Sequence, residues 1–147
     1  GVPPMLGCVR TAVEKGAQPA AILGFRNQGA VILEGDFHDE CETFVTTDDG
    51  TYGEKGFTTV KLKELLEKAK AEGQQYDHCI CIGPLPMMKA VALWTTARGI
   101  ECQLSMEQRM GCGYGTCVTC VVDTVAGRSK VCSDGPVFTA QQLGWEA

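Results

Sequence analysis

Four cysteines in the last third of the chain limit the possible folds more than any other feature. Three of them form a C-x4-C-x2-C run in a glycine-rich loop, and the fourth follows a short segment of β character: Cys112, Cys117, Cys120 and Cys132. This spacing is the plant-type ligand pattern of a [2Fe–2S] cluster. The sequence therefore predicts that four thiolates converge on one iron–sulfur cluster.

The glycines of the same loop suit that chemistry. A loop around a compact anionic cluster needs positive φ angles, and Gly113 and Gly115 adopt them without a Cβ clash. Their backbone N–H groups can then point at the cluster sulfurs and tune the reduction potential. Two other uses of the cysteines stay open at this point. One is a structural zinc ion, although zinc ribbons usually carry two short C-x2–4-C knuckles; the other is disulfide bonding, although no secretory context is evident.

Composition places the chain among ordinary globular proteins. Its 147 residues are 44% hydrophobic and 21% charged, which allows a hydrophobic core and argues against disorder. The net charge of −5 comes without a basic stripe, so no nucleic-acid partner is expected, and no apolar run reaches the length of a membrane span. The nine cysteines cannot all pair within one chain, so a reducing cytoplasm is expected. The five cysteines outside the motif are expected to be small buried side chains: Cys8, Cys41, Cys79, Cys81 and Cys102.

Apolar runs typical of buried strands alternate with segments of helical periodicity over the first 107 residues. The expected strands are residues 19–25, 41–47, 77–82 and 100–106, and the expected helices are residues 5–15, 58–71 and 87–98, with a short irregular helix within 28–37. Such alternation predicts crossover connections and an α/β fold with a parallel sheet. After the cysteine loop, two short strands are expected at residues 120–123 and 128–132, around a turn.

Glycine- and proline-rich loops follow the expected strands, at the edge where open α/β sheets bind ligands. Residues 1–5 and 83–87 each place a glycine before a helix start, which suits a dinucleotide phosphate. The alternatives are an ordinary proline-started helix and a plain turn between strand and helix, because a full GxGxxG motif is absent. No Ser–His–Asp set or carboxylate pair is evident, so electron transfer is favoured over acid–base catalysis.

Several segments together resemble the electron-transfer subunit of NAD-dependent (B-type) dihydroorotate dehydrogenase, within the ferredoxin-reductase superfamily. The matching segments are residues 1–5 (GVPPM), 23–26 (LGFR), 47–53 (TDDGTYG), 83–90 (GPLPMMKA), 109–120 (RMGCGYGTCVTC) and 131–138 (VCSDGPVF). The cysteine segment and the C-x-D-G-P-x-F ending are the most specific of these.

The resemblance implies a truncated NAD-binding α/β domain over residues 1–107 and a [2Fe–2S] module over residues 108–147. An FAD-binding barrel and the first strand of the NAD domain are expected upstream of the given chain. Electrons would pass from the FMN of a dihydroorotate dehydrogenase catalytic subunit, the partner in a heterotetramer, through the cluster to FAD and NAD⁺ in pyrimidine biosynthesis. The residues implied to contact nucleotide are Gly1, Val2, Pro3, Pro4, Gly24, Phe25, Arg26, Gly83, Pro84 and Met87. No catalytic cysteine is assigned, because Ile82 stands directly before Gly83-Pro84, where many superfamily members carry cysteine.

Two other functions remain as alternatives. The flavin and iron–sulfur subunit of NAD(P)H-dependent ferredoxin or sulfide oxidoreductases looks similar along the whole chain but often uses Asp where this sequence has Cys112. A zinc-stapled interaction module without redox activity belongs to a different class. Apolar residues beside the cysteines are expected to form a docking face for a protein partner, or to shield the cluster from water: Met110, Tyr114, Val118 and Phe138.

Overall fold

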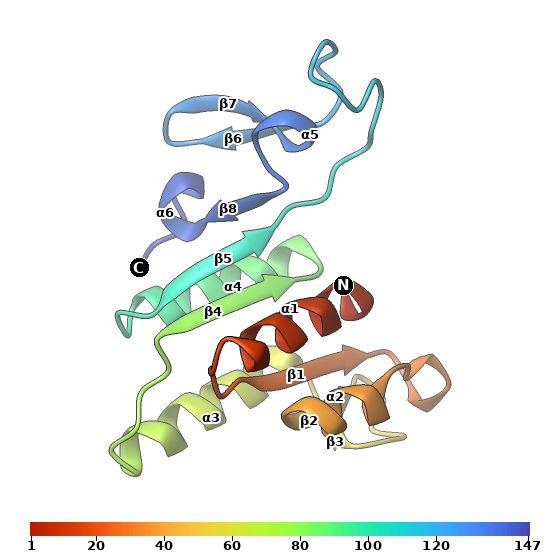
Figure 1. The fold of residues 1–147 in the computed structure, drawn as a ribbon, viewed down its shortest axis with the longest axis vertical. Helices are drawn as coiled ribbons and strands as arrows, with labels where there is room; N and C mark the ends of the chain where they lie inside the picture. Colours follow the sequence, from red (N-terminus) through yellow and green to blue (C-terminus); the bar gives the residue numbers. More distant parts are fainter. The chain divides into compact units, whose positions relative to one another are not determined.

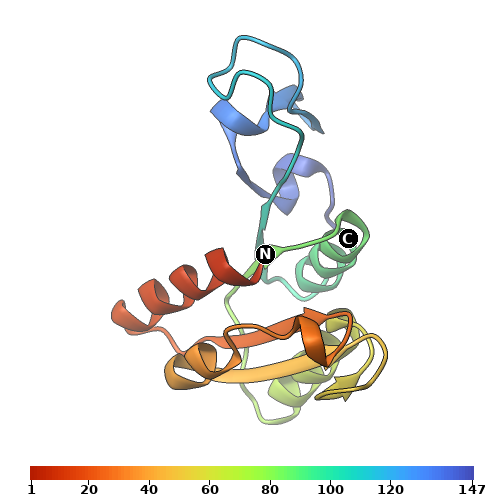
Figure 2. The same cartoon turned by 90° about the vertical axis from the view of Figure 1, so that its right-hand side faces the viewer.

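The computed structural model describes residues 1–147 and divides into two compact units, Gly1–Gly73 and Gln74–Ala147. Figures 1 and 2 show both units as ribbons. Each contains a small three-stranded sheet in which neighbouring strands with a helical crossover run parallel. The expected α/β class with parallel strand pairing is confirmed, and the parallel strands fall into two sheets. The expected boundary between residues 107 and 108 stays a prediction.

The first unit alternates helices and strands along the chain (Figure 1). Its elements are α1 (Val2–Glu14), β1 (Ala20–Phe25), the 3-10 turn η1 (Gln28–Ala30), α2 (Glu34–Glu40), β2 (Glu42–Thr47), β3 (Glu54–Lys55) and α3 (Thr58–Ala71). The sheet order is β1-β2-β3, with all pairs parallel. Because β1 and β2 run in the same direction, the loops after both strands lie at one edge of the sheet.

The core of the first unit follows from the alternation of side chains along β1. Ala21 and Leu23 are buried against α1, α2 and β2, in one cluster with Leu6, Phe37 and Val45. The intervening positions face the other side of the strand. There Gly24 lies so close to Thr58 that an added Cβ would stand 2.5 Å from the Thr58 methyl carbon. The end of β1 is thus fixed against the first turn of α3.

The second unit contains a parallel pair and a hairpin. Its elements are β4 (His78–Ile82), α4 (Leu85–Thr96), β5 (Glu101–Ser105), β6 (Val121–Thr124), β7 (Gly127–Lys130), α5 (Val131–Asp134), β8 (Val137–Thr139) and α6 (Ala140–Leu143). The sheet order is β4-β5-β8, and β6 pairs with β7 as an antiparallel hairpin. None of the helices of the chain is both long and apolar enough to cross a bilayer.

Two features of the second unit differ from the sequence-based expectation. Residues 128–132 were expected to form one strand, but β7 ends at Lys130 and Cys132 lies in the short helix α5. The reason is local: the Asp134 carboxylate accepts the Lys130 backbone N–H at 2.6 Å, which turns the chain out of the strand. In addition, β8 pairs antiparallel with β5, with Phe138 opposite Leu104. Phe138 is only 3% exposed, so its assignment to a docking face is wrong.

Candidate iron–sulfur site

The four cysteines of the motif lie on the two sides of the β6–β7 hairpin in the second unit. Cys112 and Cys117 lie in the irregular loop between β5 and β6, Cys120 directly precedes β6, and Cys132 lies in α5. The β6–β7 hairpin fixes the last two, because Val121 pairs with Lys130 and the Val131 N–H donates to the Cys120 carbonyl at 2.9 Å. Figure 2 shows the loop extending beyond the hairpin.

The sulfurs interact as two pairs. The Cys112 and Cys117 thiols contact each other, the Cys120 and Cys132 thiols form a hydrogen bond, and the charge of Cys112 also acts on Cys132. No three His, Cys, Asp or Glu side chains are arranged around one point that could hold a single metal ion. A [2Fe–2S] cluster places two thiolates on each of two irons, whereas structural zinc needs four ligands around one ion. The pairwise arrangement fits the binuclear cluster.

Hydrogen bonds favour the thiolate forms of the first pair. The pKa of Cys112 is lowered to about 5. The largest cause is the Cys117 backbone N–H, which lies 3.4 Å from the Cys112 sulfur. Hydrogen bonds from the Thr116 hydroxyl and the Tyr114 backbone N–H lower the pKa further. The Thr119 hydroxyl, 3.3 Å from the Cys117 sulfur, lowers the pKa of Cys117. Thiolates are the metal-binding form of cysteine. The pKa of Cys132 is instead raised, chiefly by its hydrogen bond with Cys120.

Three glycines of the loop have the roles that a cluster site requires. Gly113 and Gly115 have φ angles of +79° and +95°, as the sequence predicted. An added Cβ at Gly111 would stand 2.9 Å from the Cys117 sulfur and 2.8 Å from the Thr119 hydroxyl. Backbone N–H groups of the loop donate to sulfur, including that of Gly115 to Cys132. The loop therefore lets the main chain approach the sulfurs closely.

Sequence reasoning missed two polar residues that hold this loop. Thr119 bonds the Cys117 sulfur, and the Lys130 ammonium donates to the Gly115 carbonyl across the site. The cysteine spacing gives no sign of either contact, because both depend on how the hairpin folds back on the loop. The position of Lys130, two residues before the last cysteine, was the only available signal.

The expected nucleotide-contacting residues of the first unit lie at one edge of its sheet. Gly1 is the N-cap of α1, with prolines in the first turn of the helix, and residues 24–26 end β1. Val2 and Phe25 pack against the same core cluster of the first unit. Arg26 is exposed beside them. This edge is where an open α/β sheet binds ligands.

Gly83, Pro84 and Met87 lie in the second unit, where β4 turns into α4. Met87 folds back over the turn: its terminal methyl carbon lies 2.2 Å from the position of an added Gly83 Cβ, and its sulfur lies 3.4 Å from the Cys81 sulfur. A side chain at position 83 would have to displace the flexible end of the Met87 side chain. Pro84 is exposed at the helix start.

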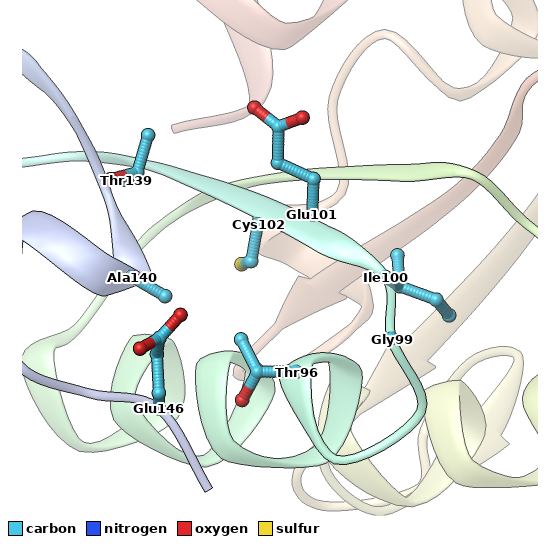
Figure 3. Close-up of a pocket in the computed structure, with 8 residues that line it drawn as sticks. All are labelled: Thr96, Gly99, Ile100, Glu101, Cys102, Thr139, Ala140 and Glu146. Carbon is cyan, nitrogen blue, oxygen red and sulfur yellow. The ribbon is translucent and has the colours of Figure 1, made fainter.

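A cavity of about 290 Å³ lies elsewhere in the second unit, at the start of β5 (Figure 3). It is lined by Thr96, Gly99, Ile100, Glu101, Cys102, Thr139, Ala140 and Glu146. Since β4 and β5 are parallel, this end of the sheet is opposite to the turn at Gly83. The cavity contains none of the residues expected to contact nucleotide.

The α/β fold and the paired cysteines have the arrangement of an iron–sulfur binding protein, and the comparisons with known proteins agree. Residues 107–144 match the family model described as the iron–sulfur cluster binding domain of dihydroorotate dehydrogenase B. The family model and the relatives described next, which match nearly the whole chain, confirm the resemblance to the electron-transfer subunit of dihydroorotate dehydrogenase B that was predicted from the motifs.

Curated relatives carry the name dihydroorotate dehydrogenase B (NAD(+)), electron transfer subunit. Those of Geobacillus thermodenitrificans and Bacillus velezensis are 38% and 39% identical over 146 residues, which cover 97% of this chain and 53% and 54% of the relatives. The chain thus spans about half the length of the curated relatives it matches. The chain also superposes on a solved structure, an NADH-dependent reduced ferredoxin-NADP oxidoreductase studied for flavin-based electron bifurcation. The TM-score is 0.79 and the sequence identity is 26%, and the match covers 99% of this chain and 51% of that chain.

Proposed function

We propose that this chain is part of the electron-transfer subunit of a dihydroorotate dehydrogenase complex in pyrimidine biosynthesis. Cys112, Cys117, Cys120 and Cys132 would hold a [2Fe–2S] cluster. When bound, that cluster supplies one-electron transfer between the FMN of the dihydroorotate-oxidising subunit and an FAD that reduces NAD⁺. The chain itself then has no substrate-binding catalytic residue; it holds and tunes the electron carrier.

The observation that carries this proposal is the pairing of four thiols at a loop whose main chain donates to sulfur. The lowered pKa of Cys112, caused first by the Cys117 N–H, prepares one ligand as a thiolate. Hydrogen bonds to cluster sulfurs and an all-cysteine ligand set are the features that set the potential of such clusters. A midpoint of roughly −400 mV is expected, by analogy with plant-type ferredoxins.

The nucleotide part of the proposal rests on the two sheet edges. The residues proposed to contact NAD in the first unit are 1–4 and 24–26, at the edge of its sheet. Those proposed in the second unit are Gly83, Pro84 and Met87. In this proposal residues 1–107 are the NAD-binding part and residues 108–147 carry the cluster. FAD is assigned to sequence that the chain does not include. The FMN-containing catalytic subunit is the proposed partner, in a heterotetramer, and the cytoplasm is the proposed compartment.

The test is cluster reconstitution in the purified protein under anaerobic conditions. The unmodified chain is expected to gain iron and sulfide in equal amounts, to absorb in the visible range and to show an electron paramagnetic resonance signal after reduction. Cys132→Ser is expected to lose most of the iron, because one iron then lacks a thiolate. Cys8→Ser, in α1 of the first unit, is the matched control and is expected to keep the full iron content. A colourless protein that binds one zinc ion per chain would instead support an interaction module.

The solved oxidoreductase that superposes on this chain favours a second candidate, the flavin and iron–sulfur subunit of an NAD(P)H-dependent ferredoxin oxidoreductase. The two functions differ in the partner. Reduction of the cluster by dihydroorotate in the presence of an FMN-containing dihydroorotate dehydrogenase supports the first function. Reduction by NAD(P)H and transfer to ferredoxin, without any response to dihydroorotate, supports the second.

A further inference from the structure

We infer that Lys130 is a positioning residue of the cluster site, acting through the peptide groups of Gly115 and through its own positive charge. This inference rests on the proposed cluster, and it assigns to Lys130 a role that the cysteine motif does not contain. Lys130 ends β7, and its ammonium reaches across to the cysteine loop.

Both polar groups of Gly115 are used in this contact. Its carbonyl accepts the Lys130 ammonium, and its N–H donates to the Cys132 sulfur. Gly115 has a φ of +95°, and an added Cβ would stand 3.3 Å from Ser133. The loop that carries Cys112 and Cys117 is therefore fastened to the segment that carries Cys132, with Gly115 as the point of attachment.

The main chain around Lys130 is also fixed. Its N–H donates to the Asp134 carboxylate at 2.6 Å, and Val131 next to it donates to the Cys120 carbonyl at 2.9 Å. Lys130 lies opposite Val121 in the hairpin. The ammonium thus extends from a main chain that is hydrogen-bonded on both sides of Lys130, which allows it to position the loop.

The charge of Lys130 has a predictable effect on the potential. Reduction adds one negative charge to the cluster, and a nearby cation stabilises that form. The N–H···S bond of Gly115 acts in the same direction, because hydrogen bonds to the sulfurs are among the factors that tune the potential. Removal of the ammonium is therefore expected to make the midpoint potential more negative.

The test compares Lys130→Met with Lys130→Arg and Arg128→Met. Arg128 lies two residues earlier on β7 and is exposed, and its contact with Asp123 spans 3.9 Å, so its replacement removes the same charge without touching the loop. Lys130→Met is expected to lower the midpoint potential. It is also expected to let a chelator remove the cluster at about tenfold lower concentration, because loss of a residue that supports the metal ligands lowers metal affinity by about tenfold or more. Lys130→Arg is expected to restore most of both values, and Arg128→Met to leave both unchanged.

A second readout does not need the cluster. Tyr114, which is 74% exposed in the loop, is a site for chymotrypsin. After cluster removal, cleavage after Tyr114 is expected to be several-fold faster in Lys130→Met than in the native protein or in Arg128→Met. Unchanged cleavage together with an unchanged potential, or equal effects of Lys130→Met and Arg128→Met, would overturn the inference. Failure of the native protein to bind any cluster would overturn the proposed function, while the cleavage rates would still decide whether Lys130 fastens the loop.

Discussion

Replacement of Gly111 by alanine should remove the cluster while leaving the fold intact. The added methyl group would stand 2.8 Å from the Thr119 hydroxyl oxygen and 2.9 Å from the Cys117 sulfur, where ordinary contact begins near 3.4 Å. Each neighbour must therefore move by roughly half an ångström, and crowding of this kind costs about 1–3 kcal/mol. Metal–ligand distances tolerate only about 0.2 Å. The Cys117 sulfur would consequently leave the position from which it can hold iron.

Two other glycines separate this steric effect from the general cost of adding a methyl group. Gly7 lies in α1 with nothing within 4 Å of an added Cβ, so Gly7→Ala should bind iron normally and gain about 0.5–1 kcal/mol of stability. Gly113 also has open space around it, but its φ of +79° means that Gly113→Ala strains the loop by about 1–2 kcal/mol. That strain weakens the site without displacing a sulfur.

The test compares the three variants after anaerobic reconstitution. It measures their iron content, their visible absorption and their thermal unfolding midpoint. Gly111→Ala should show the largest loss of iron with an unfolding midpoint close to that of the native cluster-free protein. Gly113→Ala should reach full iron content at higher reagent concentrations, with an unaltered absorption spectrum. If Gly111→Ala holds as much iron as Gly7→Ala, the close approach of the main chain to the Cys117 sulfur is not needed and the reasoning is refuted.

Three further outcomes are expected. Leu104→Ala, at a fully buried position of β5, should lower the free energy of unfolding by about 2–5 kcal/mol in a denaturant titration, whereas Leu93→Ala at a 42% exposed position should change it little. In cluster-free protein, iodoacetamide should modify Cys112 at a rate that rises as the pH passes about 5, because hydrogen bonds, first of all from the Cys117 N–H, lower the pKa of Cys112 to that value. Burial raises the pKa of Cys81 to about 12, so Cys81 should stay unmodified at pH 8 until the protein unfolds. Tyr114→Asp should weaken binding to an FMN-containing dihydroorotate dehydrogenase, measured by titration calorimetry, without loss of iron; iron loss would mean that the ring shields the cluster.

The regular elements were predictable because their patterns are local. Residues 58–71 carry an apolar stripe at helical spacing, and α3 has these bounds. Its Leu65, Leu66 and Ala69 are buried, whereas Val60 in the first turn of the same helix is 51% exposed. The apolar runs that became β1 and β4 were equally clear, although the structure buries only Ala21 and Leu23 of β1 and only Cys81 of β4. The positive φ angles of Gly113 and Gly115 followed from the shape that a cluster loop must have.

The remaining features depend on contacts between segments far apart in the sequence. Phe138 alternates with exposed Val137 along β8, and its burial comes from pairing with Leu104 and from the ring packing over Gly135, where an added Cβ would stand 2.5 Å from it. A single sequence does not show which strand β8 joins. The same is true of Lys130, whose side chain acts on a residue 15 positions earlier.

The pairing of β8 with β5 gives a last prediction about what the cluster-bearing segment needs in order to fold. A fragment of residues 108–147 keeps all four cysteines of the motif but loses β5, so Phe138 loses Leu104 and the Met106 N–H no longer bonds the Pro136 carbonyl at 2.8 Å. The hairpin alone is a poor scaffold, because an isolated pair of strands is marginally stable in water. A fragment of residues 74–147 keeps β4, α4 and β5 and should bind iron as the whole chain does. Reconstitution of both fragments, followed by circular dichroism and iron analysis, measures the difference. Full iron binding by residues 108–147 alone would mean that the four thiolates and the loop suffice, and that the added strand serves another purpose.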